Sequence, residues 1–133
     1  MRRLLTICLL ALAAVMVAAP AALTATEPAP TITRVQPMRV SVGSLLTITG
    51  THFKAERRSN TVIFRAPDGR VVFAKPRSAT THKLVVQVPA GVARLLRVSD
   101  SEPLPTRLKL RVLAGKFSEF TPRRISPVVT SVD

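Results

Sequence analysis

Histidine, cysteine and the acidic residues are the side chains best suited to catalysis or metal binding, and this sequence contains few of them. Its two histidines are His52 and His82, and its single cysteine is Cys8. A general base needs a nucleophile and an orienting carboxylate within reach, and no spacing ties an acidic residue to either histidine. One cysteine and two histidines also make too small a set for a structural zinc site. We therefore predict no catalytic residue, no metal ligand and no cofactor, and we interpret His52 as a turn residue and His82 as a surface residue.

One acidic cluster offers the oxygen ligands that calcium prefers. Asp100-Ser101-Glu102 lies in a loop that Pro103 and Pro105 stiffen. A calcium loop needs several oxygen ligands at short spacing, so two carboxylates are too few. The sequence also lacks a glycine-rich phosphate loop and a Gly-x-Ser-x-Gly nucleophile motif. These observations favour a binding protein, and we expect it not to be an enzyme.

Basic residues are the one class of functional side chain that stands above background. The chain has 20 Lys+Arg against 7 Asp+Glu, a formal net charge of +13. Arg107, Lys109 and Arg111 alternate with aliphatic residues, so the two-residue period of a strand would place all three cations on one face. Arg57-Arg58 and Arg123-Arg124 add two doublets. Such a face could bind a polyanion, with contacts that weaken as salt rises; the alternative is a solvated outer face that discourages edge pairing.

The first 25 residues have the order typical of a secretory signal peptide. Two arginines precede residues 4–17, which carry no charge, and small residues follow. This apolar stretch of 14 residues is shorter than the roughly 20 that a helical membrane span needs, although an uncleaved anchor is the alternative. Cleavage after Ala21 or after Ala25 fits the small-residue rule, and we favour Ala25. Residues 1–25 are therefore predicted to be a cleaved signal peptide.

Export would change which partners the positive charge indicates. Removing residues 1–25 leaves 133 − 25 = 108 residues with no cysteine and a net charge of 18 − 7 = +11. A cytoplasmic protein this basic would point to nucleic acid, whereas a secreted one meets anionic wall polymers, phospholipid head groups or acidic polysaccharides. We expect a secreted or cell-surface bacterial protein whose partner is an extracellular protein or an anionic envelope polymer or glycan. Export argues against nucleic acid as the partner.

Short alternating runs rich in β-branched residues predict an all-β fold. The predicted strands are residues 31–35, 46–49, 61–65, 70–74, 84–88 and 107–112. Ala66-Pro67-Asp68-Gly69 lies between two of them and predicts a β-hairpin. The best helical candidate, residues 92–97, is too short to form a stable helix alone. Short strands separated by Pro and Gly turns are typical of a β-sandwich or barrel.

Three motifs occur in a recognisable order along these strands. Residues 30–37 read PTITRVQP, residues 43–53 read GSLLTITGTHF, and residues 84–91 read LVVQVPAG. Together they resemble the IPT/TIG domain, an immunoglobulin-like β-sandwich shared by plexins and transcription factors. The resemblance covers about residues 30–115 and implies a module that acts in binding, adhesion or structural spacing. His52 stands where the family more often has Asn in its Gly-x-Asn-Phe signature.

The resemblance and the strand pattern together predict the core and the boundaries. A tight bend at Gly50 would let Phe53 swing back under the sheet. The expected core comprises Leu46, Ile48, Phe53, Val62, Phe64, Val86, Val88, Leu108 and Leu110. We expect a linker at residues 26–30, the immunoglobulin-like domain at 31–117 and a tail at 118–133. Residues 127–133 repeat the pattern of residues 30–36, so they are either the opening strand of a second repeat or a tail of similar composition.

Overall fold

The computed structural model describes residues 27–132, and the predicted signal peptide lies outside the described residues. Within them, no helix is both long enough and apolar enough to cross a membrane. This part of the chain has three short 3-10 helices, at Arg57–Ser59, Ala90–Leu95 and Arg123–Ile125. The strands are β1 (Thr31–Gln36), β2 (Arg39–Ser41), β3 (Leu45–Thr51), β4 (Thr61–Arg65), β5 (Val71–Ala74), β6 (Ser78–Ala79), β7 (Lys83–Gln87), β8 (Val98–Ser99), β9 (Glu102–Pro103), β10 (Thr106–Arg107), β11 (Lys109–Ala114), β12 (Lys116–Phe117) and β13 (Val128–Thr130).

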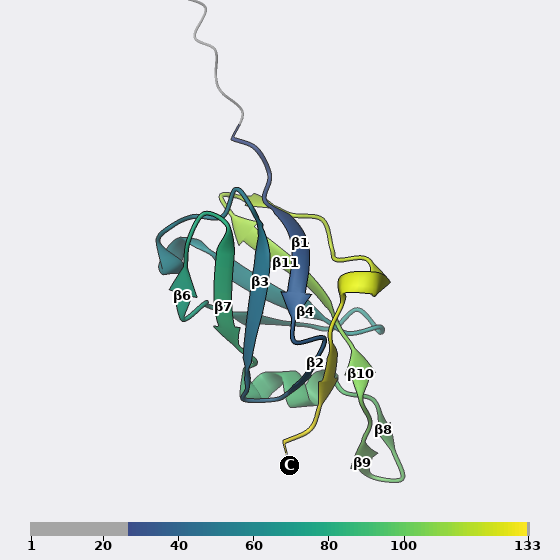
Figure 1. Cartoon of the computed structure of the whole chain (residues 1–133). Coiled ribbons are helices and arrows are strands. Elements are labelled where there is room, and N and C mark those ends of the chain that lie inside the picture. The colour runs from purple at the N-terminus through teal and green to yellow at the C-terminus, as the bar shows by residue number, and fades with distance from the viewer. Residues whose placement is uncertain (1–26, 133) are drawn as a thin grey trace, which may run out of the picture.

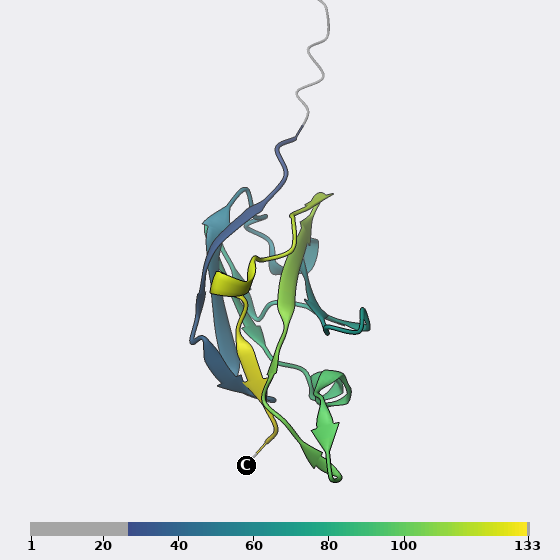
Figure 2. The same ribbon diagram turned by 90° about the vertical axis from the view of Figure 1, so that its right-hand side faces the viewer.

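In the described residues, two four-stranded sheets form two layers (Figures 1 and 2). One has the strand order β1-β3-β7-β6 and the other has the order β12-β11-β4-β5. A third, smaller sheet has the order β10-β13-β2, in which β13 runs parallel to β2 and antiparallel to β10. Two packed, mostly antiparallel layers of short strands make an immunoglobulin-like β-sandwich. The all-β prediction is therefore confirmed.

The hairpin predicted between two apolar runs joins β4 to β5. The Ala66 N–H donates to the Arg70 carbonyl at 2.8 Å, and Gly69 has a φ of 92°, a conformation that favours glycine. The Asp68 carboxylate accepts hydrogen bonds from the Arg70 main-chain N–H at 3.0 Å and from Arg70 Nε at 2.6 Å. These bonds, the main-chain one first, hold the pKa of Asp68 below its usual value.

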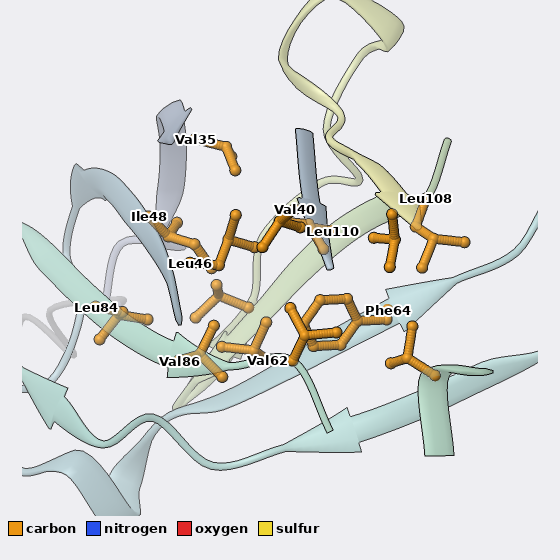
Figure 3. Close-up of a cluster of buried hydrophobic side chains, with 14 of the residues drawn as sticks. Val35, Val40, Leu46, Ile48, Val62, Phe64, Leu84, Val86, Leu108 and Leu110 are labelled. Carbon is orange, nitrogen blue, oxygen red and sulfur yellow. The ribbon is translucent and has the colours of Figure 1, made fainter. Parts of the chain in front are cut away.

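The core lies between the two large sheets, and all nine of its predicted residues are buried. Figure 3 shows Leu46 and Ile48 from β3 with Val62 and Phe64 from β4 in one apolar cluster. The period of two along each strand directs these side chains inward. Since the cluster contains no disulfide, aliphatic packing holds the two layers together.

Gly50 and His52 shape the bend after β3 as the sequence predicted. A Cβ atom at Gly50 would lie 1.9 Å from the Thr31 carbonyl oxygen and 2.7 Å from Cζ of Phe53, so no larger residue fits without displacement. His52 has a φ of 62°, a left-handed conformation in which Asn and His are enriched. This bend buries Phe53, which is 3% exposed. The turn role of His52 and the core role of Phe53 are confirmed.

The run predicted as one strand, residues 107–112, forms two strands. β10 pairs with β13, whereas β11 pairs with β4. Leu108 lies between them, and its N–H donates to the Pro127 carbonyl at 3.0 Å. The chain thus passes from one sheet to another at Leu108. The alternation of side chains continues through this change of partner, which is why the sequence pattern did not reveal it.

The C-terminal segment belongs to the same sandwich. β13 pairs with both β2 and β10, and its central residue Val129 is fully buried. The domain therefore continues beyond Phe117, where the sequence predicted its boundary. Within the described residues, 127–130 provide a strand of this domain, neither a free tail nor the first strand of a separate repeat. Its partner β2 lies about 90 residues away in the chain and its partner β10 about 20, so local pattern could not identify them.

Candidate functional site

Arg107, Lys109 and Arg111 point away from the core, as the alternation predicted. The aliphatic residues between and after them are fully buried, whereas Lys109 is exposed and the two arginines are half-buried. The three cations do not form one open ribbon, because the chain changes sheets at Leu108. Each of the two arginines is instead held by contacts of its own.

Arg107 is fixed by main-chain carbonyls of the C-terminal segment. Its Nη1 donates to the Arg123 carbonyl at 3.0 Å and to the Ser126 carbonyl at 2.8 Å. A guanidinium held in this way loses less conformational entropy when it binds a ligand. The same two bonds tie β10 to the 3-10 helix Arg123–Ile125, seen beside β1 and β11 in Figure 1.

Arg111 is fixed on the outer face of β11 by a carbonyl and two aromatic rings. Its Nε donates to the Ser118 carbonyl at 2.8 Å. Its guanidinium carbon lies 4.3 Å from the ring centre of Phe117 and 5.0 Å from that of Phe120. Arg65 lies 4.9 Å from the Phe120 ring centre, so this ring contacts two cations. Arg111 is thus largely engaged within its own chain.

Buried hydroxyl groups hold the segment that carries these contacts. Ser118 Oγ accepts the Val112 N–H and Thr121 Oγ1 accepts the Leu110 N–H, each at 2.9 Å. Thr121 and Ser126 also share a hydrogen bond of 2.7 Å between their hydroxyl groups. The segment therefore caps the edge of β11 with side chains as well as main chain. This network could not be predicted from the sequence, because Ser and Thr after a strand give no signal of which amides they will reach.

A basic pocket lies where β10 and β11 diverge. Its volume is about 540 Å³, and the cations that line it are Arg65, Arg97, Arg107, Lys109 and Arg123. The other lining residues are Ala66, Pro67, Thr106 and Ser126, so no carboxylate lines it. Only Arg107 and Lys109 come from the predicted cationic face, and Arg111 does not line this pocket.

The remaining cations of the basic pocket come from distant parts of the chain. Arg123 belongs to a doublet that the sequence analysis singled out, whereas Arg65 ends β4 and Arg97 follows a 3-10 helix. Nothing in the sequence linked Arg65 or Arg97 to the predicted face. The β4–β11 register makes Arg65 the direct cross-strand partner of Lys109, which brings two like charges together.

The doublet Arg57-Arg58 lies in a second pocket, which we call the Arg58 pocket. Its volume is about 710 Å³, and Lys75 and Arg77 also line it. Lys75 Nζ donates to the Arg58 carbonyl at 3.0 Å and to Thr61 Oγ1 at 2.7 Å. The Arg58 pocket is thus also positively charged, but it is separate from the predicted face.

Strand β5 presents an apolar free edge. Among residues 27–132, it ends its sheet and has β4 as its one partner strand. The bond from Ala66 to the Arg70 carbonyl makes these two residues a hydrogen-bonded pair. Because antiparallel pairs alternate, the main-chain groups of Val71 and Phe73 face away from β4. Their side chains are also exposed, by 42% and 62%.

The two histidines line one shallow pocket of about 450 Å³ together with Lys54 and Glu27. His82 Nδ1 lies 2.9 Å from Thr81 Oγ1, and Lys54 forms an ion pair with Glu27. The Asp100–Glu102 loop is the tip of the β8–β9 hairpin. Across residues 27–132, no three His, Cys, Asp or Glu side chains gather in a group that could hold a metal ion.

Comparisons with known proteins identify the domain. The family model of the IPT/TIG domain matches residues 30–103. No curated protein matches the chain. Among solved structures, a structural genomics protein of unknown function from Bacteroides thetaiotaomicron superposes with a TM-score of 0.60 and 13% sequence identity. The match covers 79% of this chain but only 22% of the other, so the similarity shows a shared fold.

Proposed function

Because the chain belongs to the IPT/TIG family, whose immunoglobulin-like modules are usually involved in binding or structure, we propose that it is a non-catalytic binding module of the bacterial cell surface or exterior. Support for export comes from the sequence of residues 1–25, which has the order of a signal peptide. N-terminal sequencing of the extracellular form should begin at Thr26. Recovery of an intact Met1 form from the cytoplasm would contradict this part of the proposal.

The proposed binding surface for a protein partner is the free edge of β5. The other exposed long edge, β1, reads TITRVQ, whereas β5 reads VVFA without a charged or proline residue. The far edge of the β5 sheet is capped by the Ser118 and Thr121 hydroxyl groups. An unprotected apolar edge accepts an extended segment of another chain by main-chain pairing. The single observation that carries the proposal is the joint exposure of side chain and main chain at Val71 and Phe73.

Site-specific photocrosslinking in the producing cell would test this surface. A photoreactive residue at position 73 should give one discrete adduct with an extracytoplasmic protein. The matched control is position 45, because Leu45 is 50% exposed on the opposite sheet. Equal adducts at both positions, or an adduct at 45 alone, would reject the β5 edge.

A second candidate function is binding to an anionic envelope polymer. The observation that favours it is the basic pocket, in which five cations gather without a carboxylate. Binding of this kind should weaken steeply as NaCl rises. Lys109→Glu is the appropriate charge reversal, since Arg107 and Arg111 also hold their own chain. Lys109→Glu should weaken retention of purified envelope polymer, and retention that does not change as NaCl rises would remove this candidate.

A further inference from the structure

We infer that the basic pocket is a discrete site for a phosphoryl group carried on a polyol, as in a phosphodiester polymer or a sugar phosphate. The inference deepens the second candidate function and rests on it. The inference specifies one pocket and one class of ligand, whereas the second candidate function requires only a positively charged surface. Five cations from four separate segments converge here, and they include residues outside the predicted strand face.

The charges of the basic pocket are unbalanced within the chain. Arg65 and Lys109 are direct cross-strand partners, and like charges in that position destabilise a sheet. The carboxylate of the adjoining turn, Asp68, is bonded to Arg70. A bound anion would offset the repulsion that the fold itself does not offset. The site is therefore arranged for an anionic ligand.

The cations are also partly positioned before any ligand arrives. Two carbonyls hold Arg107 Nη1, and the Phe120 ring supports Arg65. The Arg97 main-chain N–H donates to Thr106 Oγ1 at 2.8 Å, which fixes the backbone beside β10. Preorganised donors bind an anion at a lower entropic cost than mobile surface lysines do.

The chemistry of the lining selects among anions. Arginine presents a planar fork of N–H donors that matches two oxygens of a phosphate group, and four of the five cations are arginines. No aromatic side chain lines the basic pocket, so it lacks the aromatic platform on which nucleobases commonly stack. Its volume leaves room for a polyol beside the phosphoryl group. These features favour a phosphorylated polyol over a nucleotide.

Isothermal titration of the purified exported protein would test the site with three probes. Inorganic phosphate, glycerol 3-phosphate and a short glycerol phosphate polymer distinguish a free ion from an esterified phosphoryl group. Arg65→Gln and Lys109→Gln should each weaken binding by about tenfold, the loss expected for one charge-assisted contact. Arg58→Gln and Arg77→Gln remove the same charge from the Arg58 pocket and should leave binding within about twofold, because these cations do not line the basic pocket.

The melting temperature without ligand gives a second readout. Lys109→Gln removes a like-charge pair, so its melting temperature should equal or exceed that of the wild type. Equal weakening by the two pairs of variants would overturn the site. Polygalacturonate, a polymer with carboxylates and no phosphate, is the control ligand, and its tighter binding than that of glycerol phosphate polymer would also overturn the site. Salt-sensitive polymer binding that survives Arg65→Gln and Lys109→Gln would reject the basic pocket while leaving the second candidate function standing. Absence of any polymer binding would reject both.

Discussion

At the scale of single residues, Gly50 is the glycine at which an added side chain would meet the closest contacts. A Cβ atom there would overlap the Thr31 carbonyl oxygen and crowd Phe53. We expect Gly50→Ala to lower the free energy of unfolding by about 3 kcal/mol or more, since strand and core must both shift. Gly43→Ala is the control. Gly43 has a φ of 90° but nothing within 4 Å of its Cβ position, so its cost should be about 1–2 kcal/mol of backbone strain. Urea denaturation measures both, and equal losses would contradict the packing argument.

Asp68 provides a residue-scale prediction for acid. The Arg70 hydrogen bonds lower its pKa in the folded state. The ionised group therefore contributes stability above its unfolded-state pKa, and this contribution is lost as pH falls through the lowered folded-state value. Since the pair is exposed, the effect should be small. Thermal melts should show a stability gap between wild type and Asp68→Asn at neutral pH that closes in strong acid. A gap that widens on acidification would contradict this account.

At the scale of elements, β13 is the strand that completes the sandwich. It pairs on both sides, and Val129 is fully buried. A chain ending after Ser126 should lose about 3 kcal/mol or more, because it loses a buried valine and two strand pairings. A chain ending after Thr130 should keep nearly all of its stability. Thermal unfolding separates these outcomes, and wild-type stability in the shorter chain would show that β13 is a dispensable tail.

The elements also show what the sequence could predict and what it could not. β1, β3, β4, β5 and β7 follow from alternation and turn residues, since both act over a few neighbouring positions. The β4–β5 hairpin follows from Pro67 to Gly69 for the same reason. The exchange of sheets at Leu108 and the placement of β13 depend on pairing between distant segments. Local periodicity contains no information about those partners.

The candidate site could likewise be predicted from the sequence only in part. Alternation correctly directed Arg107, Lys109 and Arg111 away from the core. The contribution of Arg65 and Arg97 to the basic pocket arises only when β4 pairs with β11 and the Arg97 main chain bonds to Thr106 of β10. Whether a cation is free to bind a ligand or is held by its own chain likewise depends on tertiary contacts. Arg111 is an example, because its guanidinium contacts two phenylalanine rings and donates to a carbonyl of its own chain.

At the scale of the whole molecule, the two edges of the sheet that contains β5 differ in a way that bears on function. The β11 edge is capped by residues 118–121, whereas the β5 edge is open and apolar. The chain is strongly basic, so anionic partners would approach quickly and specificity would depend on local geometry.

Amide hydrogen exchange along β5 tests the central claim most directly. In the free protein, the amides of Val71 and Phe73 should exchange much faster than those of Val72 and Ala74, which pair with β4. With the crosslinked partner bound, Val71 and Phe73 should become protected to the level of their neighbours. Uniform protection of all four amides in the free protein, or unchanged fast exchange at Val71 and Phe73 in the complex, would contradict the proposal that this edge is the binding surface.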